Sequence, residues 1–153
     1  MLYTHFMTDM ILKVAAKAVV INDDGKVLLL REASTNKEGT NLGRYCNPGG
    51  RLNPGETYED GLRREVMEET GLSIELLYPI YVGEWHPVIN GIPHQIIAIF
   101  TVCKAGSSEV KLSEEHDDYK WIKAEDRNKY DIMEPEGKVL DRYGNWLSRK
   151  LPK

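Results

Sequence analysis

The chain has 153 residues, 41% of them hydrophobic, which is the size and composition of one globular domain with a sizeable core. Its net charge of -4, without a basic tract, argues against non-specific binding to a nucleic-acid polymer. No apolar run is long enough to span a membrane, and two cysteines give neither a disulfide framework nor a zinc pattern. We therefore predict a single domain over residues 1–153 in a reduced, cytoplasmic setting, with residues 1–10 as a flexible N-terminal extension.

The first predicted elements form a hairpin. Residues 13–21, KVAAKAVVI, are short, apolar and rich in valine, which predicts a strand. The turn residues 22–25, NDDG, follow, and residues 26–31 predict the returning strand, which ends at Arg31. Residues 32–43 are polar and contain two glycines, so they predict a loop, either a substrate flap or a simple connection.

Residues 49–72, GGRLNPGETYEDGLRREVMEETGL, combine a glycine-rich entry with a predicted helix. Thr57 is the predicted N-cap, and Asp60, three residues later, completes a capping-box pattern. Gly71 stands where a helix stop places a C′ glycine. The glycines before the helix let the backbone approach a ligand or a metal closely.

Three carboxylates of this helix, Glu65, Glu68 and Glu69, stand at i, i+3 and i+4 and therefore share one face. Like charges at this spacing repel by roughly 0.2–0.5 kcal/mol per pair, and the negative end of the helix dipole lies nearby. Arg64 faces Glu68 at i+4 and offsets part of the repulsion. A cluster of oxygen ligands that is unfavourable without a cation suggests a Mg²⁺ or Mn²⁺ site.

A solvated acidic helix face is the alternative interpretation of these carboxylates. The apolar residues of the helix argue against it, because Tyr58, Leu62 and Val66 form an i, i+4, i+8 stripe. At about 100° per residue this stripe abuts Glu65 and Glu69. The carboxylates are therefore predicted at the edge of the buried face.

This stretch resembles the signature of the Nudix hydrolases. That signature runs Gly, five residues, Glu, seven residues, Arg-Glu, an aliphatic residue, any residue, Glu-Glu, any residue, Gly and an aliphatic residue. Every fixed position agrees here, and the matches are Gly50, Glu56, Arg64, Glu65, Val66, Glu68, Glu69, Gly71 and Leu72. The preceding Pro48 and Gly49 also resemble the family, whereas Tyr45 stands where Trp is more usual.

The resemblance implies the α/β Nudix fold, an α/β/α sandwich with a mixed central sheet. It implies hydrolysis of a nucleoside diphosphate linked to another group, with Mg²⁺ (or Mn²⁺) as the cofactor. The metal ligands implied are Glu65, Glu68, Glu69 and the carbonyl of Gly49. Gly50, Glu56 and Gly71 are implied as structural residues, with Glu56 anchoring the loop to the helix through an arginine such as Arg64.

After the signature, residues 73–88 and 92–104 flank Asn90-Gly91, which is a strong hairpin signal. Both faces of the second arm carry apolar groups, which predicts a central strand covered on both sides. His86 and His94 flank the turn and are interpreted as cross-strand neighbours, in preference to metal ligands. Trp85 is expected to be buried, although it could instead stack on a nucleobase.

The segment EEHDDYKWI, residues 114–122, resembles Nudix proteins in which a glutamate precedes the tryptophan that opens the last strand. Glu115 matches that glutamate, with the tryptophan at Trp121, and would complete the metal site or act as general base. An exposed acidic loop is the alternative. Residues 124–130 predict a helical turn and residues 138–149 a C-terminal helix.

The resemblance implies catalytic roles for Glu65, Glu68, Arg64 and Glu115. Arg64 would orient the carboxylates, whereas any of the three glutamates could be the general base. An arginine near the position of Arg31 often contacts phosphate in the family, with a solvent-facing side chain as the alternative. Arg31 and Arg51 are the predicted substrate-binding residues.

The general resemblance is to MutT-like nucleoside triphosphate pyrophosphohydrolases, which release a nucleoside monophosphate and pyrophosphate. Pro87 lies fifteen residues after Leu72, a spacing that resembles ADP-ribose pyrophosphatases, so an ADP-ribose or nucleotide-sugar pyrophosphatase is the alternative. A nucleotide-sensing Nudix module is the non-enzymatic alternative, which the complete set of signature glutamates disfavours. The expected partner is a small nucleotide, with no nucleic-acid polymer and no membrane, and the chain is expected to be a monomer or a homodimer.

Overall fold

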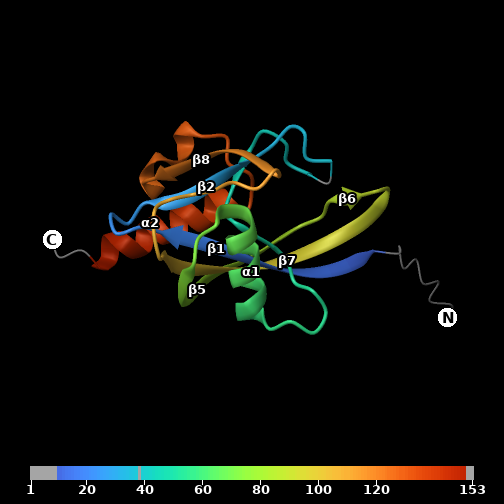
Figure 1. Ribbon diagram of the computed structural model, residues 1–153, viewed down its shortest axis with the longest axis horizontal. Helices are drawn as coiled ribbons and strands as arrows, with labels where there is room; N and C mark the ends of the chain where they lie inside the picture. Colours follow the sequence, from blue (N-terminus) through green and yellow to red (C-terminus); the bar gives the residue numbers. More distant parts are fainter. Residues whose placement is uncertain (1–9, 38, 151–153) are drawn as a thin grey trace, which may run out of the picture.

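The computed structural model describes residues 10–37 and 39–150 of the chain. Its elements, shown in Figure 1, are β1 (Ile11–Ile21), β2 (Val27–Glu32), β3 (Tyr45–Cys46), β4 (Gly49–Arg51), α1 (Tyr58–Thr70), β5 (Ile74–Trp85), β6 (Val88–Ile89), β7 (Ile92–Ala105), β8 (His116–Ile122), the 3₁₀-helix η1 (Ala124–Lys129) and α2 (Glu136–Lys150). Among the described residues, no helix is long and apolar enough to cross a membrane. The extension predicted for residues 1–10 falls outside the described residues, except for Met10.

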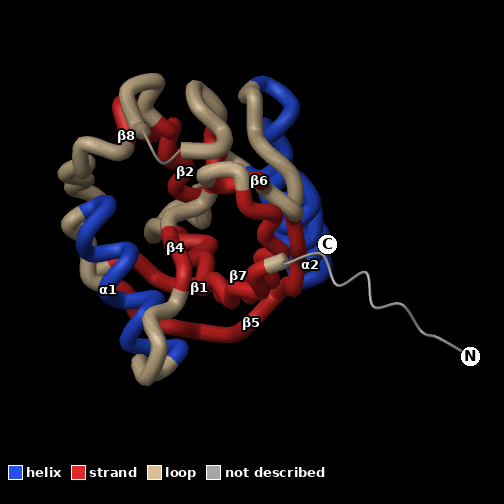
Figure 2. Tube along the Cα trace, turned by 90° about the vertical axis from the view of Figure 1, so that its right-hand side faces the viewer, coloured by secondary structure: helices blue, strands red, loops and turns tan. Residues whose placement is uncertain are grey.

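The strands form a mixed sheet with helices on both faces. Its main path runs β3-β2-β1-β7-β5, while β4 pairs with β1, β6 with β7 and β8 with β2. β1 and β7 are parallel along the whole of β1, and the other pairs of strands are antiparallel. Figure 2 shows α1 and α2 on opposite sides of the strands. The predicted α/β/α sandwich with a mixed sheet is confirmed.

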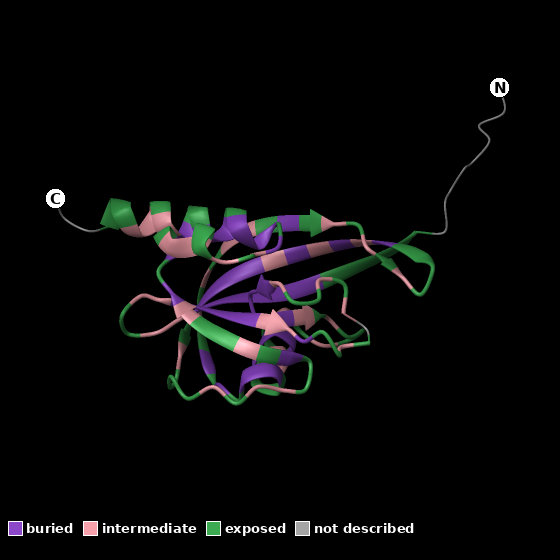
Figure 3. Cartoon of the chain, turned by 90° about the horizontal axis from the view of Figure 1, so that it is seen from above, coloured by how far each residue is buried: buried purple, intermediate pink, exposed green. Residues whose placement is uncertain are grey.

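The buried residues of β1 alternate between two cores, because successive side chains in a strand point to opposite faces. On one face, Ala16 and Val20 pack in the cluster that contains Leu62 of α1. On the other face, Val19 packs in the cluster that contains Tyr143 of α2. Figure 3 shows buried stretches of the strands between the two helices. The continuous apolar run that predicted this strand therefore reflects a strand covered on both sides.

The structure places the boundaries of α1 where the sequence predicts them. The Thr57 side chain accepts a hydrogen bond from the backbone N–H of Asp60, at 3.2 Å. Gly71 has a φ of 69°, a left-handed conformation that glycine adopts without steric cost, and its N–H donates to the carbonyl of Met67. Leu62 and Val66 are fully buried, so the apolar stripe is confirmed as the inner face of the helix.

The second predicted hairpin is confirmed, and β7 lies between β1 and β5. Asn90 and Gly91 at its turn both have positive φ values, of 52° and 77°. His94 donates its backbone N–H to the carbonyl of Pro87, so the two histidine-bearing segments are cross-strand neighbours as expected. Trp85 is half-buried and packs against the cluster that faces α2.

The first predicted hairpin differs from the structure. β1 and β2 share only the pair Ile21 and Val27 beside the turn. Farther along, β4 pairs with β1 from Ala15 to Lys17, and β2 pairs with β3 and β8 instead. The turn was predicted correctly, but the strands that leave it diverge because β4 takes the edge of β1. This divergence brings the glycine-rich loop up to β1, next to the C-terminal half of α1.

The predicted helical turn and C-terminal helix are confirmed as η1 and α2.

Candidate active site

A cavity of about 750 Å³ lies where the glycine-rich loop meets α1. The loop of residues 49–54 forms one wall, and the carboxylates of α1 form another. Residues 113–115, from the segment before β8, close a third side, and Lys13 of β1 completes the lining. The cavity therefore gathers segments that are far apart in the sequence around one group of acids, which comprises Glu65, Glu68, Glu69, Glu114 and Glu115.

Arg64 is the centre of the hydrogen bonds on the outer side of this group. Its Nε and Nη2 donate to the two carboxylate oxygens of Glu56, at 3.1 and 2.8 Å. Its Nη1 donates to Glu65 at 2.8 Å and to Glu68 at 3.3 Å. Glu56 also accepts the backbone N–H of Asn53, so it ties the loop to the helix in the way that the resemblance implied. The hydrogen bonds from Arg64 and Asn53 hold the pKa of Glu56 down at about 2.

Glu69 lies deeper than the sequence predicted, with only 8% of its surface exposed. One of its carboxylate oxygens accepts the backbone N–H of Gly49 at 2.8 Å. Burial raises the pKa of Glu69 to about 8, against the opposing effects of Lys17 and of this hydrogen bond. Burial also raises the pKa of Glu65, although Arg64 opposes it. Two of the three helix carboxylates are therefore poorly stabilised as anions by the chain alone, which is the condition that a bound cation relieves.

The glycines of the loop leave room for these carboxylates. Gly49 has a φ of 127°, and a Cβ there would collide with the backbone of Ala16 and Lys17. A Cβ on Gly50 would lie 2.6 Å from the carboxyl carbon of Glu65. Since only a hydrogen atom fits there, the loop backbone lies directly against the acids. The donor set, carboxylate oxygens beside a close-lying backbone, fits a hard divalent cation such as Mg²⁺ or Mn²⁺.

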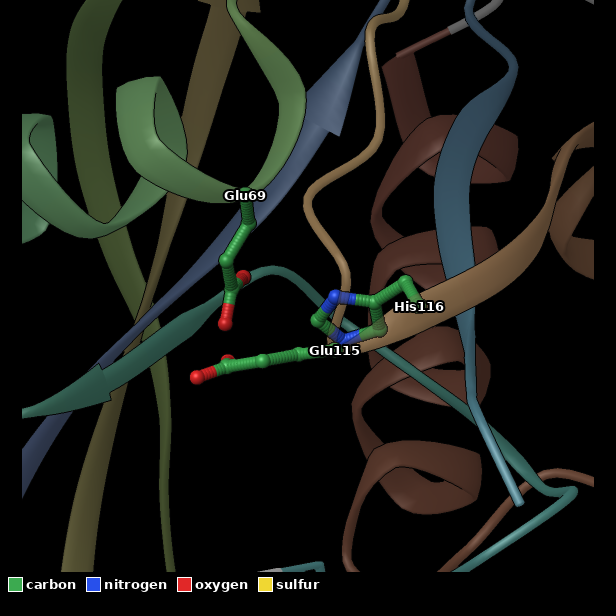
Figure 4. Close-up of side chains that lie close together, drawn as sticks. All are labelled: Glu69, Glu115 and His116. Atoms are coloured by element: carbon green, nitrogen blue, oxygen red, sulfur yellow. The ribbon is translucent and has the colours of Figure 1, made fainter. Parts of the chain in front are cut away.

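Glu115 approaches the site from the segment before β8, as the sequence suggested. Figure 4 shows its carboxylate near that of Glu69, with the ring of His116 beside them. One ligand atom from each of these three residues lies within 4.8 Å of the other two. Glu115 is exposed, whereas His116 is 9% exposed and burial lowers the pKa of its imidazole to about 4.

The sequence did not identify three residues near the site. His116 follows Glu115 directly, so its proximity to a predicted ligand was the available signal. Lys17 was a charge in the middle of an apolar strand, and it is buried with its Nζ 3.6 Å from a carboxylate oxygen of Glu136. Burial lowers the pKa of Lys17, but the nearby Cys46, Glu136 and Glu69 outweigh this effect, and the net shift is upward. Glu136, the first residue of α2, is itself fully buried.

The two predicted substrate-binding arginines lie in different surroundings. Arg51 is exposed and lines the cavity. Arg31 is not part of that lining, and its Nε donates to a carboxylate oxygen of Asp117 at 2.6 Å. The structure thus brings Arg51 to the acids, whereas Arg31 is held on Asp117 at the end of the β2–β8 pair that adjoins His116.

Comparison with known proteins defines the class to which this fold and site belong. Residues 11–143 match the NUDIX domain family, which is most of the chain. The chain therefore belongs to the Nudix family, and it is a Nudix pyrophosphohydrolase, as predicted.

Similar proteins within this family include a named enzyme and several solved structures. The chain is 33% identical over 131 residues to the nucleoside triphosphatase NudI of Escherichia coli, covering 79% of this chain and 89% of that protein. Its structure is similar to that of the MutT protein from Methanosarcina mazei Go1, with a TM-score of 0.78 and 27% identity over 94% of this chain and 99% of the other. A MutT Nudix hydrolase from Burkholderia pseudomallei shares the fold, with a TM-score of 0.72 and 23% identity over 86% of this chain and 97% of the other. The expected likeness to MutT proteins is confirmed.

Proposed function

We propose that this protein is a nucleoside triphosphate pyrophosphohydrolase that uses Mg²⁺ (or Mn²⁺) and releases a nucleoside monophosphate and pyrophosphate. The observation that supports it most directly is the convergence of Glu65, Glu68, Glu69 and Glu115 on one cavity. The E. coli relative at 33% identity, which is named a nucleoside triphosphatase, favours a triphosphate substrate.

The acidic residues of the cavity would have two roles, in metal binding and in proton transfer. Glu65, Glu68, Glu69 and the carbonyl of Gly49 would hold the divalent ions. When bound, such ions neutralise the charge of the phosphates and lower the pKa of a coordinated water. Glu65, Glu68 or Glu115 would act as general base and accept the proton of the attacking water. Glu68 has a side chain that is 60% exposed, so it can reach solvent without any rearrangement of the helix.

Three arginines around the acids would position either the carboxylates or the substrate. Arg64 keeps Glu65 and Glu68 in place through the hydrogen bonds of one guanidinium group. Arg51 lies in the cavity wall and would contact the phosphates. Arg31 would have to exchange its contact with Asp117 for one with the substrate. We also propose that the protein works in the cytoplasm, where its cysteines remain reduced, as a monomer or a homodimer.

A panel of substrates with identified products tests this proposal. It contains nucleoside triphosphates, oxidised nucleoside triphosphates, ADP-ribose, nucleotide sugars and dinucleoside polyphosphates. Each is incubated with Mg²⁺ and with wild type, Glu68→Gln or Glu59→Gln. Glu59 is an exposed glutamate in the first turn of the same helix, so Glu59→Gln is the matched control. Because even outer partners of a metal site are worth 10- to 100-fold, we expect Glu68→Gln to lose about a hundredfold or more in rate.

The products decide between the candidate functions. A monophosphate plus pyrophosphate from a triphosphate, lost in Glu68→Gln and kept in Glu59→Gln, would support the proposal. Two monophosphates from ADP-ribose or a nucleotide sugar would replace it with the alternative pyrophosphatase. Tight, Mg²⁺-dependent binding of one nucleotide without turnover of any compound would contradict it and favour a nucleotide sensor.

A further inference from the structure

His116 lies beside the two carboxylates at the inner side of the acidic site. One ligand atom from each of Glu69, Glu115 and His116 lies within 4.8 Å of the other two. Figure 4 shows the imidazole next to both carboxylates, with the three side chains coming from α1, from the segment before β8 and from β8 itself. Two ligands of one ion lie at most about 4.4 Å apart when each bond is about 2.2 Å long. Small side-chain rotations therefore suffice to bring all three to one ion.

The imidazole of His116 is buried, and one of its two nitrogens is unpaired in the described part of the chain. Only 9% of the residue is exposed, and its Nδ1 is buried without a hydrogen-bond partner in the described part of the chain. Buried polar atoms are normally paired with protein groups, water or an ion, so this nitrogen is available to bind a ligand from outside the chain. An imidazole nitrogen is also among the commonest metal ligands in proteins.

The backbone holds Glu115 and His116 so that both side chains reach Glu69. Adjacent residues in a strand would point to opposite faces. Here Glu115 lies in a turn, which the hydrogen bond from the His116 N–H to the Ser113 carbonyl closes. The carbonyl of Glu115 also accepts the N–H of Ala33, which fixes the turn against the end of β2. The turn redirects Glu115, and the two neighbours converge on one point.

We infer that His116 is a metal ligand, and that with Glu69 and Glu115 it forms a mixed imidazole–carboxylate site that prefers a first-row transition-metal ion such as Mn²⁺ to Mg²⁺. This inference rests on the proposed metal-dependent function and adds a nitrogen ligand to it. Carboxylates alone suit Mg²⁺, whereas imidazole shifts the preference toward transition metals. The alternative is an imidazole that only packs against the carboxylates.

Pulsed EPR of Mn²⁺ bound to the protein distinguishes a ligand from a neighbour. A coordinated imidazole gives a ¹⁴N coupling that changes when the histidines carry ¹⁵N. The measurement is made on wild type, on His116→Phe, which keeps a buried ring without nitrogens, and on His94→Phe. His94 is also buried but is not part of the group of Glu69, Glu115 and His116, so it is the matched control. Titrations with Mn²⁺ and Mg²⁺ accompany the spectra, and circular dichroism verifies that each variant is folded.

We expect a histidine ¹⁴N coupling in wild type and in His94→Phe, and its loss in His116→Phe. We also expect His116→Phe to weaken Mn²⁺ binding by about tenfold or more and Mg²⁺ binding by much less. Mn²⁺ bound to wild type without a histidine coupling would overturn the inference and leave the proposed function intact. Wild type that binds neither ion, even with a nucleotide present, would overturn both. A wild-type spectrum without a histidine coupling is decisive alone, whether or not His116→Phe folds.

Discussion

The buried carboxylate of Glu69 makes the metal-free protein sensitive to pH in a predictable direction. Burial raises the pKa of Glu69 from an ordinary value of 4.5 to about 8. The folded protein therefore binds this proton more tightly than the unfolded chain does. When a folded-state pKa of an acid is raised, stability is greatest below the unfolded pKa and is lost as the pH rises through the folded pKa. The window for Glu69 runs from about pH 4.5 to about pH 8.

The magnitude follows from the size of that window. One pKa unit corresponds to about 1.4 kcal/mol of free energy. At pH 7 the folded, metal-free protein keeps Glu69 largely protonated while the unfolded chain ionises it, which lowers the stability by roughly 3 kcal/mol, and by somewhat more at pH 8. A glutamine cannot ionise, and its side-chain oxygen can still accept the N–H of Gly49. We expect metal-free Glu69→Gln to be more stable than wild type by roughly 3 kcal/mol at pH 7 and by little at pH 4.5.

Urea denaturation with EDTA, at several pH values from 4.5 to 8, measures this difference. Groups far from residue 69 titrate alike in both proteins, so the gap between the two curves reports on Glu69 and on the groups that interact with it. Glu59→Gln, at an exposed position of α1, should follow wild type at every pH. Adding Mg²⁺ or Mn²⁺ should stabilise wild type at pH 7 and Glu69→Gln much less. Parallel stability curves for wild type and Glu69→Gln would refute this reasoning, because they would mean that Glu69 ionises as readily in the folded state as in the unfolded chain.

Three further substitutions have expected outcomes. Gly50→Ala places a methyl group against the carboxyl of Glu65, and steady-state kinetics should show a rate reduced by about a hundredfold while the fold survives. Arg64→Lys removes the two-pronged contact with Glu56, so kcat should fall by about tenfold or more, whereas a fall of less than twofold would show that a point charge suffices. Thr57→Ala removes the oxygen that caps α1, and thermal denaturation should show a loss of about 1 kcal/mol with little change in metal affinity.

The parts of the fold that were predictable from the sequence depend on local rules. The boundaries of α1 follow from a capping side chain at Thr57 and a left-handed glycine at Gly71, and the buried face follows from 3.6-residue periodicity. The divergence of β1 and β2 was not predictable, because it depends on β4 pairing with β1 far from the turn. The same holds for Lys17 and Glu136, which are 119 residues apart in the sequence and meet only when α2 packs on the sheet.

The depth of Glu69 has a consequence for the whole site. Arg64 contacts Glu56, Glu65 and Glu68, but no hydrogen bond joins it to Glu69 among the described residues. The cation that favours the ionised form of Glu69 is Lys17, which is also the ion-pair partner of Glu136. One buried ammonium group therefore faces two buried carboxylates. Ionising both would leave one negative charge too many in this low-dielectric region, so the metal-free protein keeps Glu69 protonated up to about pH 8. A cation at the acidic site supplies the missing charge. The chain thus buries Glu69, a proposed metal ligand, where its ionised form is unfavourable without a cation. Functional sites often depart in this way from the residues that would be best for stability.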